Sequence, residues 1–173
     1  MSSNAVLMYA STQSADMHHV IPHEVHDPFL YIEHEGNRFT AVKSLEAARM
    51  RDIPAMTGFP LDELGFDDFR AAGQDPDTAE LNTLVEACRR VGVTSAVVPP
   101  TFPIDVADHL RANGIELSVD RDLFVMRRRV KTPEELAGIR RAQIAAEAGV
   151  SHVADALDRS EIGADGGLLL DGV

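Results

Sequence analysis

The stretch from Phe29 to Val42 has the sequence FLYIEHEGNRFTAV. Two runs rich in aromatic and β-branched residues, Phe29–Glu33 and Arg38–Val42, flank a Glu-Gly-Asn segment centred on Gly36. Such a segment between two short apolar runs is typical of a tight turn, so the stretch predicts a β-hairpin. Because a hairpin joins antiparallel strands, any sheet that contains it must be at least partly antiparallel.

Short apolar runs alternate with helical patterns on both sides of the hairpin. Asp77 and Glu80 form a capping-box pattern that predicts a helix ending at Gly92. The other expected elements are strands over residues 6–10, 95–98, 115–119 and 123–126, and helices over residues 15–20, 45–50 and 104–112. This alternation predicts an α/β sandwich built around a mixed sheet.

A second clear signal follows at Thr132, Pro133 and Glu135. Threonine at the N-cap, proline at the first helical position and glutamate at the third together predict a helix start. The helix is expected to run to about Leu157 and to carry one apolar stripe, Leu136, Ile139, Ala146, Val150, Val153 and Leu157. The remaining residues, 160–173, are Gly-rich and acidic, and the stripe has no partner after it in the sequence. We therefore expect a further domain or another chain to cover it.

Composition excludes several classes of function. The chain has 173 residues and a formal net charge of −12, which disfavours binding to nucleic acid. No apolar run is long enough to span a membrane, and the start, Met1–Ala5, lacks the basic and apolar regions of a secretory signal. The one cysteine, Cys88, is expected to be a packing residue, and its use is consistent with a cytoplasmic location.

A basic cluster, Arg127, Arg128 and Arg129 with Lys131, interrupts the acidic background. Adjacent arginines can mark an anion site. The interpretation that we favour is a solvated junction in which one or two of the arginines pair with acids.

Four histidines, His18, His19, His23 and His26, fall within nine residues. The spacing of His19 and His23 would suit two ligands on one helical face, but Pro22 breaks such a helix and no HExxH pattern is present. We therefore expect no metal site. The segment is either a polar loop or a loop in which His23 and His26, as substrate-access residues, line the mouth of a neighbouring subunit's active site. No acid/base pair, phosphate loop or nucleophile elbow is found, so no catalytic residue is predicted.

Residues 127–142, RRRVKTPEELAGIRRA, resemble the junction segment of the creatinase/prolidase/aminopeptidase P superfamily. There a basic stretch and a Lys-(Ser/Thr)-Pro-Glu-Glu motif lead into the first helix of the pita-bread catalytic domain. Residues 6–16, 27–36, 45–49 and 114–124 are similar to parts of the amino-terminal domain of the same proteins. The segment 18–23 departs from the aromatic-x-Thr-Gly-Phe pattern that many relatives carry after the first helix.

The resemblance implies a mixed-sheet α/β/α sandwich of the creatinase/prolidase N-terminal type over residues 1–130. Residues 131–173 would then be a linking helix and the start of a catalytic domain. The parent would be a cytoplasmic Xaa-Pro dipeptidase or aminopeptidase that acts on proline-containing peptides. Two divalent metal ions would be bound by the missing catalytic domain, and no cofactor by this chain. Neither Asp165 nor Asp171 is interpreted as a metal ligand.

The expected partners are a second copy of the chain, in a homodimer, and the missing catalytic domain. The expected function is therefore that of a non-catalytic domain serving structure, oligomerisation and substrate access. Two alternatives remain. One is a stand-alone module that binds a peptide or protein, and the other is the equivalent domain of a creatinase-like amidinohydrolase.

Overall fold

The computed structural model describes residues 5–164 and 166–170. The contacts divide the chain into two compact units, Met1–Val130 and Lys131–Val173, and each is described by itself. Three sequence predictions involve residues outside the described ranges. They concern the start of the chain, Asp165 and Asp171.

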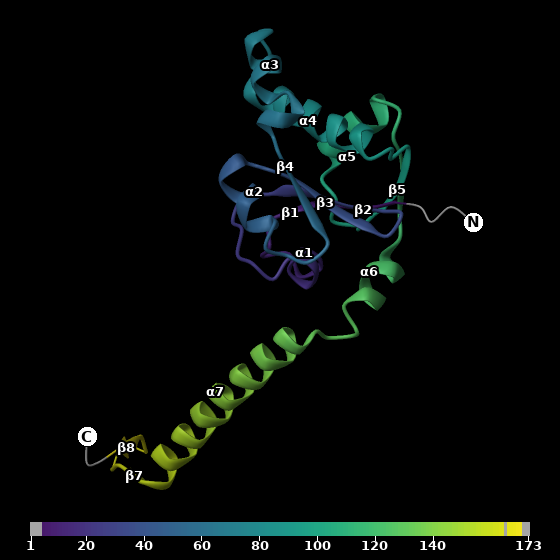
Figure 1. The fold of residues 1–173 in the computed structure, drawn as a ribbon. Coiled ribbons are helices and arrows are strands. Elements are labelled where there is room, and N and C mark those ends of the chain that lie inside the picture. Colours follow the sequence, from purple (N-terminus) through teal and green to yellow (C-terminus); the bar gives the residue numbers. More distant parts are fainter. Residues whose placement is uncertain (1–4, 165, 171–173) are drawn as a thin grey trace. The chain divides into compact units, whose positions relative to one another are not determined.

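The first unit is built on a six-stranded sheet with the order β4-β3-β2-β1-β5-β6 (Figure 1). Strand β2 is antiparallel to both of its neighbours, whereas β1/β5, β5/β6 and β3/β4 pair in parallel. The predicted mixed sheet is thus confirmed. The strands are β1 (Ala5–Ala10), β2 (Phe29–His34), β3 (Asn37–Val42), β4 (Met56–Pro60), β5 (Ser95–Val98) and β6 (Glu116–Val119).

The predicted hairpin is β2 and β3. Its register runs from Leu30 opposite Ala41 to His34 opposite Asn37, which leaves Glu35 and Gly36 as the two-residue turn. Both have positive φ, 51° and 78°, as the hairpin turn that matches strand twist requires. Glycine adopts this backbone without the steric cost that a side chain would bring.

Helices cover both faces of the sheet. On one face, α4 (Pro76–Arg90) and α5 (Ile104–Ala112) contribute Leu84 and Leu110 to a core that includes Leu7 of β1. On the other face, α1 (Ala15–Val20), α2 (Ser44–Met50) and α6 (Arg121–Arg127) pack Met17, Met50 and Phe124 against the neighbouring strand residues, Val6 and Met8 among them. Alternate residues of a strand point to opposite faces, so β1 supplies both cores and the fold is a three-layer α/β/α sandwich.

Two shorter helices lie between β4 and α4. They are η1 (Asp62–Leu64), a 3-10 helix, and α3 (Phe66–Ala71). The core-facing residue of η1 is Leu64, which is 1% exposed.

One predicted strand is wrong. Residues 123–126 belong to helix α6, because the Asp120 side chain accepts a hydrogen bond from the Leu123 backbone N–H at 2.9 Å and caps a helix there. Four apolar residues are too few for periodicity to separate a strand from a buried helical turn. Phe124 is 2% exposed and is the residue that α6 buries.

The start of α4 also differs from the prediction. Asp75, not Asp77, is the N-cap, and its carboxylate accepts from the Thr78 backbone N–H at 3.0 Å. Pro76 therefore occupies the first helical position, where its missing N–H leaves no bond unmade. The helix ends before Gly92, which has φ 78°.

The second unit begins with α7 (Pro133–Asp158), whose predicted capping box is present. The Thr132 hydroxyl accepts from the Glu135 N–H at 3.2 Å, and the Glu135 carboxylate accepts from the Thr132 N–H at 2.8 Å. After the helix, β7 (Ser160–Ile162) and β8 (Leu168–Leu170) pair as a short antiparallel hairpin. Within the described residues, none of the helices is long and apolar enough to cross a bilayer.

Candidate functional site

Five of the six strands run in one direction, because β2 is antiparallel to both β1 and β3. The carboxyl ends of these five strands therefore meet at one edge of the sheet, next to the start of β2. Ligands of open α/β sheets bind at this edge, outside the carboxyl ends of the strands. Because β2 runs the other way, the loop that precedes it lies at this edge, next to the carboxyl ends of β1 and β3.

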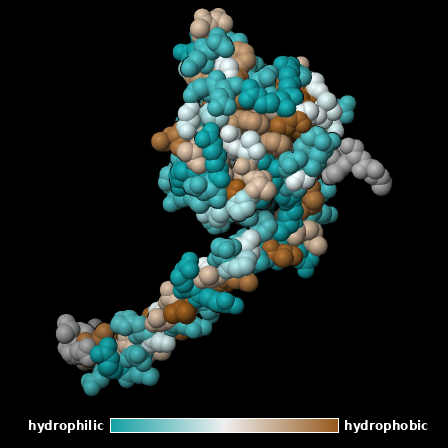
Figure 2. Space-filling view, viewed as in Figure 1, coloured by the Kyte–Doolittle hydropathy of each residue, from teal (hydrophilic) through white to brown (hydrophobic). Residues whose placement is uncertain are grey.

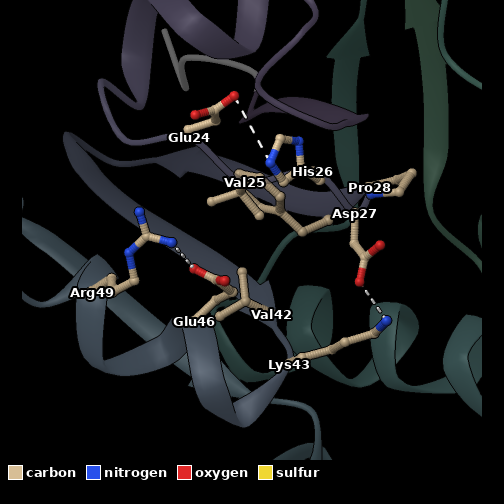
Figure 3. Close-up of a pocket in the computed structure, with 10 residues that line it drawn as sticks. Glu24, Val25, His26, Asp27, Pro28, Val42, Lys43, Glu46 and Arg49 are labelled. Carbon is tan, nitrogen blue, oxygen red and sulfur yellow. Dashed lines mark hydrogen bonds and ion pairs between the residues drawn. The ribbon is translucent and has the colours of Figure 1, made fainter.

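A cavity of about 400 Å³ lies at this edge (Figure 3). The loop before β2, the end of β3 and the outer side of α2 form its wall. The lining side chains are Glu24, Val25, His26, Asp27, Pro28, Phe29, Val42, Lys43, Glu46 and Arg49.

The polar residues of the cavity carry both signs of charge. Lys43 Nζ lies 2.6 Å from Asp27 Oδ2, and Arg49 Nη1 lies 2.9 Å from Glu46 Oε2. The hydrogen bond and charge of Lys43 hold the pKa of the Asp27 carboxyl below its ordinary value. The same hydrogen bond raises the pKa of the Lys43 ammonium. A cavity with cations and carboxylates close together suits a small zwitterion, which presents an ammonium and a carboxylate of its own.

Of the two histidines proposed for substrate access, His26 lines the cavity. Its Nε2 lies 3.8 Å from Glu24 Oε1, and the ring is exposed. His23 is half-buried in the same loop and is not among the lining residues. His18 and His19 belong to α1. The structure thus brings one of the two candidate residues to the cavity.

The loop that carries His26 is anchored by a buried threonine. Thr12 Oγ1 donates to the Val25 carbonyl at 3.1 Å and accepts from the Val25 N–H at 2.8 Å. The Thr12 backbone N–H also donates to the Val25 carbonyl, at 3.1 Å. Three bonds on one buried residue pair hold the loop next to the end of β1. Nothing in the local sequence marks Thr12 for this role, since the two partners are 13 residues apart.

Lys43, Glu46 and Arg49 were also missed from the sequence. All three come from the end of β3 and from α2, and their meeting with residues 24–28 depends on the pairing of β2 with β3. The hairpin was predicted, and it brings Lys43 near Asp27. One signal in the sequence could have found this contact. A basic residue, Lys43, follows β3 directly, and an acidic residue, Asp27, precedes β2, so the hairpin places the two side by side.

A second cavity, of about 320 Å³, lies between the end of β1 and helices α4 and α5. The Tyr9 hydroxyl donates to Glu80 Oε1 at 2.8 Å, and burial, together with Glu80, raises the pKa of that phenol. Asp77 and Asp105 also line it. This cavity is acidic, so it is less suited than the first to a ligand that carries a carboxylate.

The arginines at the end of the first unit are paired, as expected. Arg127 Nη2 lies 2.6 Å from Glu33 Oε2 of β2, and Arg128 Nε lies 2.6 Å from Asp16 Oδ1 of α1. The Tyr31 hydroxyl also donates to Glu33 Oε2, at 3.1 Å. These pairs attach the end of α6 to the sheet and to α1, so two of the arginines have a structural role.

Comparison with known proteins identifies the fold. No protein-family model matches the chain, and neither does any curated protein. Solved structures do match. An aminopeptidase P from Streptococcus thermophilus superposes with a TM-score of 0.50 at 11% identity, over 72% of this chain and 84% of that chain. The prolidase from Pyrococcus furiosus gives 0.56 at 13% identity, over 87% of this chain and 39% of that chain.

The prolidase from Pyrococcus horikoshii OT3 gives a similar result, 0.55 at 16% identity, over 87% of this chain and 38% of that chain. The chain therefore spans less than half the length of the two prolidases. At these identities the likeness shows the fold alone. It confirms the expected mixed-sheet α/β/α architecture, which this chain shares with part of an aminopeptidase P and of two prolidases.

Proposed function

We propose that this chain is the non-catalytic amino-terminal domain of a metal-dependent Xaa-Pro dipeptidase or aminopeptidase. Its roles would be structural support, oligomerisation and access of substrate to the active site. The observation that carries the proposal is the shared six-stranded α/β/α fold, matched over 87% of this chain but only 39% of a prolidase chain. The parent would act on proline-containing peptides in the cytoplasm, as a homodimer.

The cavity at the carboxyl edge of the sheet supports the role in substrate access. A short peptide is a zwitterion. Its carboxylate would compete with Asp27 for Lys43 and with Glu46 for Arg49, which are paired in the structure, and its ammonium would bind Glu24. His26 adds an exposed ring whose nitrogen atoms can form a hydrogen bond with the peptide. Each of these residues would bind or orient the peptide, and none would act on the scissile bond.

The metal ions implied for such an enzyme do not fit this chain. Across residues 5–164 and 166–170, no group of three or more His, Cys, Asp or Glu side chains is placed to hold a metal ion. Two divalent ions would belong to the catalytic domain of the parent, so no chemical step is assigned to the residues described.

Two measurements test the proposal. The product of the complete reading frame that contains this sequence should cleave Xaa-Pro dipeptides in a metal-dependent manner, and the 173-residue chain should not. In the complete protein, His26→Ala should raise the KM for the dipeptide about fivefold, the equivalent of one hydrogen bond of about 1 kcal/mol. His18→Ala, an exposed histidine on α1, is the matched control. Unchanged kinetics for His26→Ala and His23→Ala would remove substrate access from the proposal.

The same experiments distinguish the alternatives. Binding of a proline-containing peptide by the 173-residue chain, from a reading frame with no further domain, would favour a stand-alone binding module. Metal-dependent hydrolysis of creatine rather than of a dipeptide would favour a creatinase-like amidinohydrolase. The mixed-charge cavity is compatible with either ligand, since creatine is also a zwitterion.

A further inference from the structure

The larger cavity is bounded by the loop of residues 21–28, hereafter the cavity loop, which connects α1 to β2. Glu24, His26 and Asp27 line the cavity from this loop. The loop contains no helix or strand, and all of its residues are described, so regular backbone hydrogen bonding does not fix its position. The contacts that the loop and α1 make with other elements therefore decide where these side chains lie.

The apolar packing beneath the cavity loop specifies its position only loosely. This packing lies below a surface that is mainly hydrophilic, as Figure 2 shows for one face of the first unit. Val25 belongs there to a cluster that also holds four methionines, Met8, Met17, Met50 and Met56. The core cluster on the other face of the sheet contains no methionine among the described residues. Methionine is unbranched and flexible, so it fills space without imposing one arrangement. Directional polar contacts are therefore needed to define the position of the loop.

Helix α1, which leads into the cavity loop, is not stable by itself. It has six residues, and the Ser14 side chain at its N-cap makes no capping hydrogen bond. A helix of this length needs contacts with the rest of the protein. Met17 supplies an apolar contact and is 0% exposed. Asp16 supplies a polar contact, because its Oδ1 lies 2.6 Å from Nε of Arg128. The Asp16 side chain is only 17% exposed, so salt screens this ion pair less than it screens a surface pair.

Helix α6, which ends next to Arg128, is held on the sheet by contacts of its own. Phe124 of α6 is 2% exposed in the same apolar cluster as Val25. Arg127 Nη2 lies 2.6 Å from Glu33 Oε2 on β2, the strand that follows the cavity loop. Two consecutive arginines thus hold the chain on both sides of the loop. Arg128 acts before it, through α1, and Arg127 acts after it, through β2.

We propose that Arg128 is a positioning residue for the larger cavity, and that through Asp16 it holds α1 and thereby the cavity loop in place. The inference deepens the substrate-access part of the proposed function and rests on it for its use in the parent enzyme. Arg128 does not line the cavity, so it acts on a ligand only through the loop. The hydrogen bonds between Thr12 and Val25 hold the middle of the loop, and the ion pair holds the helix in front of it. Loss of the ion pair should therefore loosen the loop without unfolding the opposite face of the sheet.

Amide hydrogen exchange of the 173-residue chain, resolved by NMR, tests the proposal. The probe is the Val25 N–H, which donates to Thr12 Oγ1 at 2.8 Å. Arg128→Gln should speed its exchange about fivefold, the effect expected from one partly buried ion pair. Exchange of the Leu84 N–H of α4, on the other face of the sheet, should not change.

Arg111→Gln is the matched control. It makes the same chemical change at an ion pair with Asp108, in which Nη1 and Oδ1 lie 3.2 Å apart on α5. Helix α5 packs on the face of the sheet opposite the cavity loop, so this change should leave the exchange of the Val25 N–H as it is.

Two further variants separate the ion pair from other effects of Arg128. Arg128→Lys keeps the positive charge and should restore most of the protection of the Val25 N–H. Adding Asp16→Asn to Arg128→Gln should speed exchange by less than the two single changes predict together, because both break the same ion pair.

The complete protein supplies a functional measurement. Arg128→Gln should raise the KM for an Xaa-Pro dipeptide about threefold and leave kcat unchanged, because the cavity loop would contact the peptide and not the reacting atoms. Arg128→Lys should return the KM to its original value.

Three results would overturn the proposal. They are exchange of the Val25 N–H that Arg128→Gln leaves unchanged, an equal acceleration at Leu84, and a fall in kcat with an unaltered KM. The exchange measurements need no peptide hydrolysis, so an inactive parent protein would refute the proposed function and leave the positioning role of Arg128 intact.

Discussion

Helices α4 and α7 begin with the same local chemistry, yet α4 buries six of its 15 residues and α7 buries none of its 26. Each starts with a side-chain cap followed by proline. Asp75 accepts from the Thr78 N–H at 3.0 Å, and Thr132 accepts from the Glu135 N–H at 3.2 Å. The capping signal therefore specifies where a helix begins and carries no information on what the helix will contact.

The difference lies in the apolar faces. The face of α4 is covered by strands of the same unit, and Leu84 belongs to the core that includes Leu7 and Leu30. The apolar stripe of α7 has no such cover within the described residues of its own unit. Burial of the first face stabilises the fold directly, whereas the second can contribute only when a partner is present.

The largest change in stability is expected for a substitution in the buried face of α4. Leu84→Ala should lower the free energy of unfolding of the first unit by about 2–5 kcal/mol, because a fully buried side chain leaves a cavity. Leu157→Ala, the same change at a side chain that is 54% exposed, should alter it by less than about 0.5 kcal/mol. Urea titration followed by tyrosine near-UV dichroism measures the first unit, which contains both tyrosines. Equal effects would show that α7 is packed against the first unit.

A smaller effect is expected where α6 is attached to the sheet. Burial alone would raise the pKa of the Glu33 carboxyl, but the hydrogen bond and charge of Arg127 outweigh it and hold that pKa below its ordinary value. The ion pair of Glu33 with Arg127 therefore stabilises the fold fully at pH values above the ordinary pKa of a carboxyl group. This stabilisation is lost as the pH falls through the lower pKa that Glu33 has in the folded protein. Glu33→Gln should cost about 1–2 kcal/mol at neutral pH, after allowance for partial solvent screening.

Urea titrations of the native chain and of Glu33→Gln across the acid range measure this difference. It should disappear in acid, where the native carboxyl is protonated. A difference that does not change with pH would mean that Glu33 acts through packing and not through its charge.

The smallest effects are expected at the two caps. Asp75→Ala should lower the unfolding free energy of the first unit by less than Glu33→Gln does, since one N–H of α4 loses its acceptor. Thr132→Ala removes an equivalent bond but should leave that free energy unchanged, because α7 adds nothing to the core. Its effect should appear instead as faster amide hydrogen exchange in the first turn of α7. Faster exchange across both units together would show that the cap of α7 also stabilises the first unit.

The candidate site was only partly accessible from the sequence. His26 was proposed for substrate access and lines the larger cavity, whereas His23 of the same pair does not. That role itself stays a prediction. Lys43, Glu46 and Arg49 were not singled out, since their relation to Asp27 and His26 follows from strand pairing. The hydrogen bonds of Thr12 with the Val25 backbone could not be predicted either, because a single threonine forms no recognisable sequence pattern.

The sequence by itself determined the features that depend on neighbours along the chain. The Glu35-Gly36 turn, the capping box at Thr132 and the alternation of core residues along β1 all follow from local backbone preferences and side-chain spacing. Only the tertiary structure decided that residues 123–126 form a helix and not a strand, and that Arg127 pairs with Glu33, 94 residues away. The physical reason is that a short apolar run is stable in either conformation, and the surface it can bury against makes the choice.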